Sequence, residues 1–224
     1  MGTDITLFLE FYGLPGCGKS TVSHQVADEL RKQGKSVIEP TFELDHILSG
    51  GKRKAVKLLK LVRFTCSNPR RCRQLMRLIK DNGYKGSKLI SQAANIAPKL
   101  LTYEKAKVDY VVFDEGLTQS AISLCSVNGN SVENEAKLFA LCKKRYVRKF
   151  YIKVDLDTAL ERMDNRSQHD SRIEKIKDEK ERRKAIVDFE KKCEAISSGF
   201  VIAEKIVSDA VKSIMRQIHL IREK

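Results

Sequence analysis

The amino-acid sequence predicts one three-layer α/β domain, in which helices cover both faces of a parallel sheet of about five strands. Three observations lead to this prediction. With 224 residues, 42% of them apolar, the chain can bury one substantial core. Short apolar runs alternate with segments of helical periodicity, which favours parallel strands joined by helical crossovers. The first apolar run is followed at once by a glycine-rich turn and an amphipathic segment.

Five apolar runs are the predicted strands. Residues 5–12 are apolar apart from Thr6 and Glu10, as expected for a strand buried on both faces. The other runs are residues 36–39, 108–114, 150–154 and 200–203. Residues 19–33 show a helical apolar period, and Gly34 stands where a helix C-terminal cap belongs.

Two stretches are predicted to be helical additions to this alternation. Residues 41–107 are longer than a simple crossover, so we expect a helical insertion. Turn signals divide it at Gly50-Gly51, Asn68-Pro69, Asn82-Gly83 and Pro98. Residues 171–194 alternate basic and acidic side chains around a narrow apolar stripe, which indicates an exposed helix.

The charge of the chain predicts attraction to anions. Lys and Arg number 43 against 29 Asp and Glu, and the excess is concentrated between residues 50 and 105. The partners that fit are an anionic small-molecule substrate, an acidic membrane surface and, least favoured, nucleic acid. A solvated basic face with no partner is the alternative.

Residues 52–64 form a basic amphipathic pattern inside this region. Lys54, Lys57 and Lys60 line one side, and the other side is apolar, which suits an anionic membrane surface. The alternative is that Val56, Leu59 and Val62 pack on the core while the lysines face water.

The cysteines indicate a reducing compartment. Six are scattered through the chain without a CxxC pair or the histidine spacing of a zinc site. No secretory or membrane-spanning segment is visible. We therefore expect a cytoplasmic protein.

The turn after the first strand matches the phosphate-binding loop G-x-x-x-x-G-K-[ST]. Consecutive backbone N–H groups and a helix N-terminus hold a polyphosphate, and glycine permits its close approach. Lys19 is expected to reach the β- and γ-phosphates, and the Ser20 hydroxyl to ligate Mg²⁺. The residues expected to bind the nucleotide are Gly13, Pro15, Gly16, Cys17, Gly18, Lys19, Ser20 and Thr21.

The nucleotide is expected to be ATP. A guanine-specific Asn-Lys-x-Asp motif is approached only by residues 152–155, which lack the leading polar residue. An ordinary glycine turn is the alternative to the phosphate loop, but the strand before it and the helix after it favour the phosphate loop.

A second carboxylate site follows the third predicted strand. Asp114 stands at the carboxyl end of that strand, where parallel sheets place their ligands, so it is expected to hold Mg²⁺ as a Walker B aspartate. Glu115 beside it is a candidate base. The alternative is that Asp114 only caps the following turn.

Two arginines on a third segment complete the predicted catalytic set. Arg162 and Arg166 are one helical turn apart, so both guanidinium groups can point to one side. There they would contact the nucleotide and stabilise charge on the transferred phosphoryl group, together with Lys19. The alternative is ion pairing with neighbouring acids on an exposed helix.

The order of these parts resembles the thymidylate kinase and nucleoside-monophosphate kinase family. The resemblance rests on the phosphate loop, the strand-end Asp114, and the segment VDLDTALERMDNRSQHDSRIE. It implies a single kinase domain over residues 1–224, an acceptor-binding insertion at 41–107 and a lid at 160–180 whose end carries Arg172 and Glu174. It also implies a homodimer.

Two departures from the family bear on the acceptor. The family's Asp-Arg pair is replaced by Asp114-Glu115, so an arginine that would grip an acceptor phosphate is missing. Pro15 replaces a family residue that helps read the nucleotide sugar. We therefore expect an acceptor other than thymidylate itself.

Two functions fit these residues. The first is a kinase that moves the γ-phosphoryl group of ATP to a small acceptor, with Glu43, Asp45 or Glu115 as the general base. The second is an ATPase or switch protein that acts on a macromolecular or membrane partner, with Glu115 as the hydrolytic base. The arginine helix favours the kinase, because such a lid excludes water from the transferred group.

Overall fold

The computed structural model describes residues 5–47, 50–125, 130–142, 146–165, 173, 175–196, 199–204 and 206–222, with only the backbone described for 45–47 and 221–222. Five parallel strands form one sheet in the order β2-β3-β1-β4-β5. Their bounds are β1 Leu7–Gly13, β2 Val37–Ile38, β3 Tyr110–Phe113, β4 Tyr146–Ile152 and β5 Phe200–Ile202. The predicted three-layer α/β fold with a five-stranded parallel sheet is confirmed.

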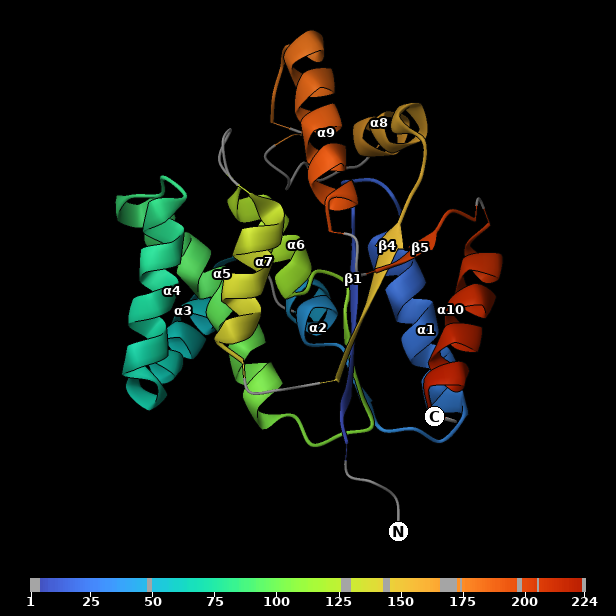
Figure 1. The fold of residues 1–224 in the computed structure, drawn as a ribbon, viewed down its shortest axis with the longest axis horizontal. Coiled ribbons are helices and arrows are strands. Elements are labelled where there is room, and N and C mark those ends of the chain that lie inside the picture. Colours follow the sequence, from blue (N-terminus) through green and yellow to red (C-terminus); the bar gives the residue numbers. More distant parts are fainter. Residues whose placement is uncertain are drawn as a thin grey trace.

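Helices cover both faces of the sheet, and each face has its own apolar core (Figure 1). One core joins the sheet to α1 (Lys19–Lys32) and α10 (Val207–Arg222). The other joins it to α6 (Leu117–Leu124), α7 (Ser131–Ala140) and the helices of residues 50–105. β1 lies in the centre of the sheet and every residue of it is buried, as its continuous apolar run predicted.

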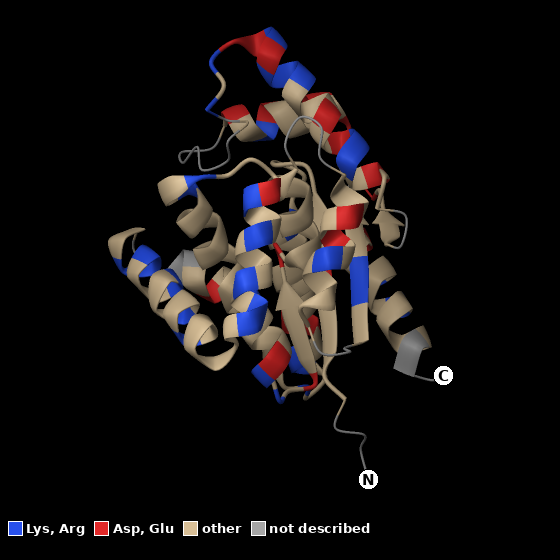
Figure 2. Cartoon of the chain, turned by 60° about the vertical axis from the view of Figure 1, so that its left-hand side comes forward, with Lys and Arg blue, Asp and Glu red and all other residues tan. Residues whose placement is uncertain are grey.

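The residues between β2 and β3 are helical. They form α2 (Pro40–Ile47), α3 (Gly50–Ser67), α4 (Pro69–Asp81) and α5 (Gly86–Lys105). These limits agree with the turn signals at Gly50-Gly51, Asn68-Pro69 and Asn82-Gly83. Figure 2 shows Lys and Arg distributed along the helices on this side of the molecule.

The prediction that Pro98 ends a helix is wrong, because α5 runs through it without a break. Proline in a helix interior costs about 3 kcal/mol, since it removes one hydrogen bond and crowds the preceding turn. Ala93, Ala97 and Leu100 on the same helix are fully or almost fully buried. Their burial, at about 25 cal/mol per Å² of apolar surface, outweighs the local cost.

The fourth strand begins before the predicted start at residue 150. Residues 146–149, with the sequence YVRK, extend β4 and pair with Leu7–Glu10 of β1. β5 pairs only with residues 150–152, so the first half of β4 has one open edge that tolerates Arg148 and Lys149. The polar side chains in this half of β4 interrupt the apolar pattern that predicts a strand.

Two helices follow β4 on the way to β5. They are α8 (Leu156–Asp164) and α9 (Glu179–Glu194). The predicted exposed helix over 171–194 therefore starts later, at Glu179, and residues 171, 172 and 174 lie outside the described part of the chain. In the described chain no helix is long and apolar enough to span a bilayer.

Candidate active site

The loop after β1 has the backbone of a phosphate cradle. Gly16 has a φ of 83°, and a Cβ there would lie 2.5 Å from the carbonyl oxygen of Ala159 on α8. Only glycine allows both the left-handed backbone and this approach. α1 begins directly after the loop and has no acid in its first turn, so its N-terminus favours an anion.

Lys19 is buried against the carbonyl groups of this loop. Its Nζ donates to the oxygens of Gly13 (3.2 Å) and Leu14 (2.8 Å). These contacts hold the ammonium group inside the cradle, where an incoming phosphate offers it stronger, charged acceptors. Of the predicted loop residues 13–21, the cleft beside the loop is lined by Pro15, Gly16, Gly18, Lys19 and Ser20.

Ser20 and Asp114 meet beyond the carboxyl ends of the neighbouring strands β1 and β3, although they are far apart in sequence. The Ser20 hydroxyl donates to Asp114 Oδ2 at 2.9 Å, and Asp114 follows the last residue of β3. Thr41, at the start of α2, donates to the other carboxylate oxygen. These three oxygen groups fit Mg²⁺, which prefers hard oxygen ligands and keeps several of its waters. Thr41 was not predicted, because a lone threonine in a helix has no local signal.

Of the three candidate bases, only Glu115 lines the central cleft among the described side chains. Glu115 is exposed and lines the cleft together with residues of the phosphate loop and of α5. Glu43 is exposed outside the cleft, where its carboxylate accepts from the backbone N–H of Glu39. The side chain of Asp45 lies outside the described part of the structure.

α8 brings the first predicted arginine to the phosphate loop. Ala159 and Met163 of α8 pack against Gly16, and Arg162 Nη1 lies 3.8 Å from the position of a Cβ on Gly18. Within the described residues Arg162 makes no ion pair, whereas its neighbour Asp164 is held by Arg182 at 2.7 Å. Arg166, Arg172 and Glu174 lie outside the described residues.

A buried carboxylate on β1 holds the loop that carries Asp114 and Glu115. Glu10 Oε1 accepts from the backbone N–H of Leu117 at 2.6 Å, and Oε2 accepts from that of Thr118 at 2.8 Å. These are first-turn donors of α6, so the carboxylate caps that helix. A Cβ on Gly116 would lie 2.2 Å from Glu10 Cδ, so only glycine fits between them.

A second residue of α6 grips the start of the phosphate loop. Gln119 Oε1 accepts from the backbone N–H of Gly13 at 3.0 Å, and Gln119 Nε2 donates to the carbonyl oxygen of Gly13 at 3.3 Å. The side-chain amide of Gln119 thus pairs with the backbone of the last residue of β1, where β3 no longer provides partners. Neither Glu10 nor Gln119 was predicted to act at the site, because both contacts join residues about a hundred positions apart.

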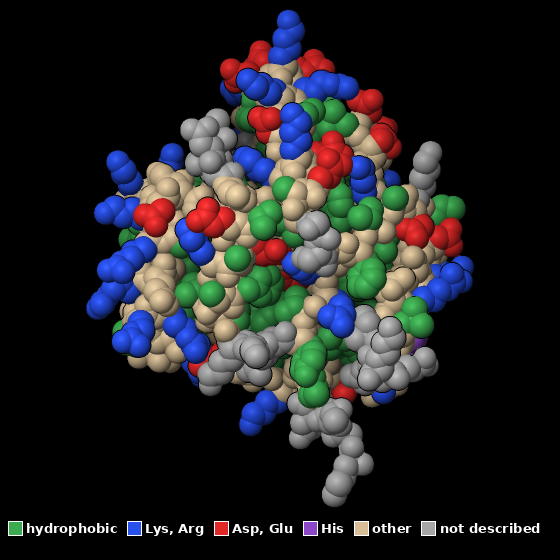
Figure 3. Space-filling model, viewed as in Figure 1, with side chains coloured by type: hydrophobic (Ala, Val, Ile, Leu, Met, Phe, Trp, Pro, Cys, Tyr) green, Lys and Arg blue, Asp and Glu red, His purple; other side chains and the backbone are tan. Residues whose placement is uncertain are grey.

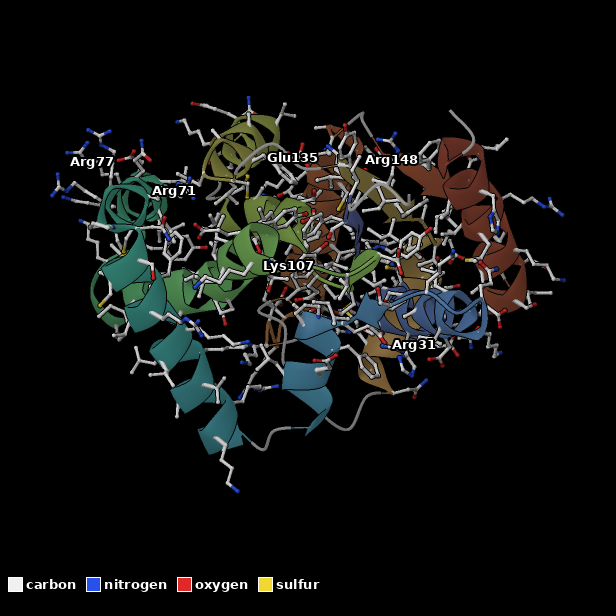
Figure 4. All side chains as sticks on the ribbon, turned by 90° about the horizontal axis from the view of Figure 1, so that it is seen from below. Arg31, Arg71, Arg77, Lys107, Glu135 and Arg148 are labelled. Carbon is white, nitrogen blue, oxygen red and sulfur yellow. The ribbon has the colours of Figure 1, made fainter. Side chains whose placement is uncertain are left out.

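A nearby acidic residue, Glu39, is turned away from the cleft. It follows β2, is 2% exposed, and lies 3.0 Å from His24 Nδ1 and 2.7 Å from Arg31 Nη1. Figure 4 labels Arg31 on the side of α1. Glu39 therefore ties β2 to α1 and supports the layer behind the phosphate loop.

The site opens into a cleft of about 1030 Å³. Its lining comes from the phosphate loop and from α2, α3, α5, α6 and α9. The cationic side chains in its described lining are Lys19, Arg53, Lys54, Lys57, Lys99, Lys175 and Lys192. Glu115 is the one acid among those lining residues. The cleft is therefore strongly positive along its described walls.

The apolar side chains predicted to pack on the core from the amphipathic segment 52–64 are largely exposed. Leu59 is 69% exposed and Val62 is 51% exposed, so the prediction that they pack on the core is wrong. Leu61 and Phe64 occupy the core instead, which turns Lys57 toward the cleft. Lys60 is partly buried, and burial lowers the pKa of its ammonium group. Figure 3 shows the Lys and Arg side chains gathered along the edge formed by α3 and α4.

Comparison with solved structures places this architecture among known folds. A deoxyadenosine kinase from M. mycoides, solved with the products dCMP and a flexible dCDP, matches with a TM-score of 0.51 and 14% identity, covering 96% of this chain and 99% of the kinase. The two chains share one fold. Structures of that kinase with bound dATP and dCTP match with TM-scores of 0.48 and 0.45, at 16% and 17% identity, covering 95% of this chain and 99% and 98% of the kinase chains.

Sequence comparisons add no closer relative. A scan of protein-family models found no match, and a search of curated proteins also found none. The match to this kinase covers nearly the whole of both chains, so the likeness of fold extends over almost all of their length. The finer resemblance to thymidylate kinases stays a prediction.

Proposed function

We propose that this protein is a cytoplasmic kinase that transfers the γ-phosphoryl group of ATP to a small-molecule acceptor. One observation carries the proposal: the hydroxyl of Ser20, which lines a cleft with room for two ligands, donates to the carboxylate of Asp114. The pairing of a phosphate-loop hydroxyl with a strand-end carboxylate is the arrangement that holds Mg·ATP in P-loop enzymes.

Each residue has a distinct task in the proposed reaction. The backbone of the phosphate loop and Lys19 bind the β- and γ-phosphates, and Ser20 and Asp114 hold Mg²⁺. The bound ion would neutralise charge that develops on the phosphate oxygens. Arg162 lies beside Gly18, where its guanidinium can stabilise the same charge.

The acceptor enters from the side of α3 and α5. Its oxygen forms a bond to the γ-phosphorus while the bond from that phosphorus to the β–γ bridging oxygen breaks, and ADP leaves. The proton of the acceptor passes to Glu115, which is the described carboxylate in the cleft wall. Closure of α8 over the loop would exclude water from the transferred group.

The experiment that tests this proposal is a phosphoryl-transfer screen. Nucleosides, nucleoside monophosphates, sugars and sugar phosphates are offered with Mg·ATP, and ADP release is compared with an acceptor-free blank. Lys19→Ala should abolish the acceptor-dependent signal while circular dichroism shows an unchanged fold. Full turnover by this variant would contradict the phosphate-loop assignment.

The same screen distinguishes the ATPase or switch alternative. Glu115 could activate water as readily as an acceptor hydroxyl. Equal ADP release in every well, including the blank, would support that alternative and remove the kinase proposal.

The outer face of α3 favours an additional role at an anionic membrane surface. Leu58, Leu59 and Val62 are exposed on it, and across α3 and α4 the acid Asp81 is outnumbered by many Lys and Arg side chains. Exposed leucines flanked by cations suit the interface of an anionic bilayer. A second copy of the chain is disfavoured on this face, because like charges would meet.

Vesicle flotation tests the membrane role. The protein should float with phosphatidylserine vesicles and stay behind with neutral ones, and Leu59→Asp should weaken flotation. Val132→Asp, a matched change at an exposed valine on α7, should not. Protein that stays wholly in solution at low salt would remove this role. The expected homodimer is checked separately by light scattering.

A further inference from the structure

The outer side of α4 is a charged surface that the proposed kinase reaction does not use. On its inner side the helix packs into the core with Cys72, Leu75, Leu78 and Ile79. On its outer side lie exposed cations at the spacing of one helix face, here called the α4 stripe: Arg70, Arg73, Arg77 and Lys80. Figure 4 shows Arg77 pointing away from the rest of the molecule. The described lining of the cleft contains no residue of α4, so the stripe needs another explanation.

The charge pattern of the α4 stripe works against the stability of its own helix. Each cation stands three or four positions from the next, where like charges on a helix repel each other. The first turn holds Arg70 and Arg71 and no acid, although the positive end of the helix dipole favours an acid there. Arg71 lies 3.9 Å from Glu104, whereas the α4 stripe makes no ion pair with any described residue. Because helix formation does not account for this pattern, we expect the compensating charge on a ligand.

The length of the α4 stripe favours a long anion over a small one. From Arg70 to Lys80 the stripe covers about 15 Å of the helix axis, at 1.5 Å per residue. A small anion reaches only neighbouring members of such a row. A nucleic acid duplex carries about one negative charge per 3.4 Å of each strand, so it can contact the whole stripe. Arginine is also the side chain that grips phosphate oxygens with two parallel hydrogen bonds.

The outer side of α4 differs from that of α3 in the side chains that a bilayer would use. α3 exposes Leu58, Leu59 and Val62, whereas none of the exposed large apolar side chains of the described chain lies on α4. A helix that binds a membrane surface inserts apolar side chains at the headgroup boundary. A phosphate backbone requires only cations. Nucleic acid was the least favoured partner when only charge was considered, and the separation of these two faces reverses that order for α4.

We propose that α4 is a docking face for the phosphate backbone of nucleic acid, which binds along the α4 stripe. The contacts are made to phosphate oxygens, so binding is independent of base sequence. The proposal goes beyond the kinase function and does not rest on it, because a strand on α4 leaves the described lining of the cleft open to ATP and the acceptor.

The salt dependence of DNA binding tests the proposal by counting these contacts. Binding of a fluorescent random-sequence DNA duplex is followed by anisotropy over a series of KCl concentrations. Each neutralised phosphate adds about −0.9 to the slope of log K against log salt concentration, so four contacts give a slope of about −3.6. The double variant Arg73→Gln/Arg77→Gln should reduce the slope to about −1.8, because two of the contacts are lost. Both side chains are exposed, so the variant should unfold at the same urea concentration as wild type.

The matched control is Lys212→Gln/Arg216→Gln. These are exposed cations one helical turn apart on α10, which covers the other face of the sheet, so the control loses equal charge and should keep the wild-type slope. The proposal is overturned if the two double variants bind DNA alike, because binding then follows the net charge alone. It is also overturned if polyglutamate displaces the duplex as well as unlabelled DNA does, which would assign α4 to an acidic protein. An Arg73/Arg77 variant that keeps DNA binding but no longer floats with phosphatidylserine vesicles would overturn it in favour of a membrane.

Discussion

Replacing Glu10 by Gln tests how the catalytic loop is held. The carboxylate is fully buried and accepts three hydrogen bonds, from the backbone N–H groups of Leu117 and Thr118 and from the hydroxyl of Tyr103. An amide offers only one oxygen. In its better orientation that oxygen keeps the Leu117 and Tyr103 donors, and the NH₂ group then faces the Thr118 N–H.

The magnitude follows from these contacts. One hydrogen bond to a charged group is lost, which is worth about 1.5–3 kcal/mol, and the charge at the α6 N-terminus disappears. We expect a loss of about 3 kcal/mol in the free energy of unfolding. For a chain of this length that lowers Tm by about 6–12 °C. Turnover should fall as well, because Asp114 and Glu115 immediately precede the released helix.

Urea unfolding followed by circular dichroism measures this loss, with Glu133→Gln as the control. Glu133 is an exposed carboxylate on α7 whose partner is Lys137, so the same chemical change there should alter stability by less than about 0.5 kcal/mol. If the two variants unfold at the same urea concentration, the buried carboxylate does not hold α6 and the reasoning fails.

Three further predictions follow from the same contacts. Asp114→Asn should raise the Mg²⁺ concentration needed for half-maximal turnover at least tenfold, and an unchanged Mg²⁺ dependence would remove Asp114 from the metal site. Gly116→Ala should lower the free energy of unfolding by about 1–3 kcal/mol, because its Cβ would meet the Glu10 carboxylate; a chemical denaturation curve equal to wild type would contradict the close approach. For Lys99→Met, the free energy of unfolding should rise less between neutral pH and pH 10 than it does for wild type. Burial lowers the pKa of Lys99 in the folded state from 10.5, so its desolvation penalty is present at neutral pH and fades as the pH rises through that lowered value. If the free energy of unfolding rises with pH as much in the variant as in wild type, Lys99 is not the cause of that rise.

Local patterns predicted the parts of the site that lie within one element. The phosphate loop combines a strand, a glycine turn and a helix start, so residues 13–21 could be read from the sequence directly. Asp114 was found because an apolar run ends just before it, and strand ends meet at one edge of a parallel sheet. The sheet itself follows from five short apolar runs.

The remaining residues of the site depend on contacts between distant parts of the chain. Glu10 interrupts an apolar run, and nothing local shows that it caps a helix 107 residues later. Gln119 and Thr41 carry no pattern, because their roles come from where the sheet places their partners. At Pro98 the burial of neighbouring side chains outweighs the tendency of proline to end a helix. The start of β4 was not predicted, because its open edge tolerates polar residues that break the apolar pattern.

Glu10 and Gln119 join β1 and α6 by hydrogen bonds in both directions. β1 holds the N-terminus of α6 through Glu10, and α6 holds the end of β1 through Gln119. These hydrogen bonds therefore hold the phosphate loop and the Asp114 loop to each other before any ligand binds. The ordering entropy of this half of the site is lost during folding and need not be lost again in each catalytic cycle. Any domain closure is then expected from α3 and α9, which also line the cleft.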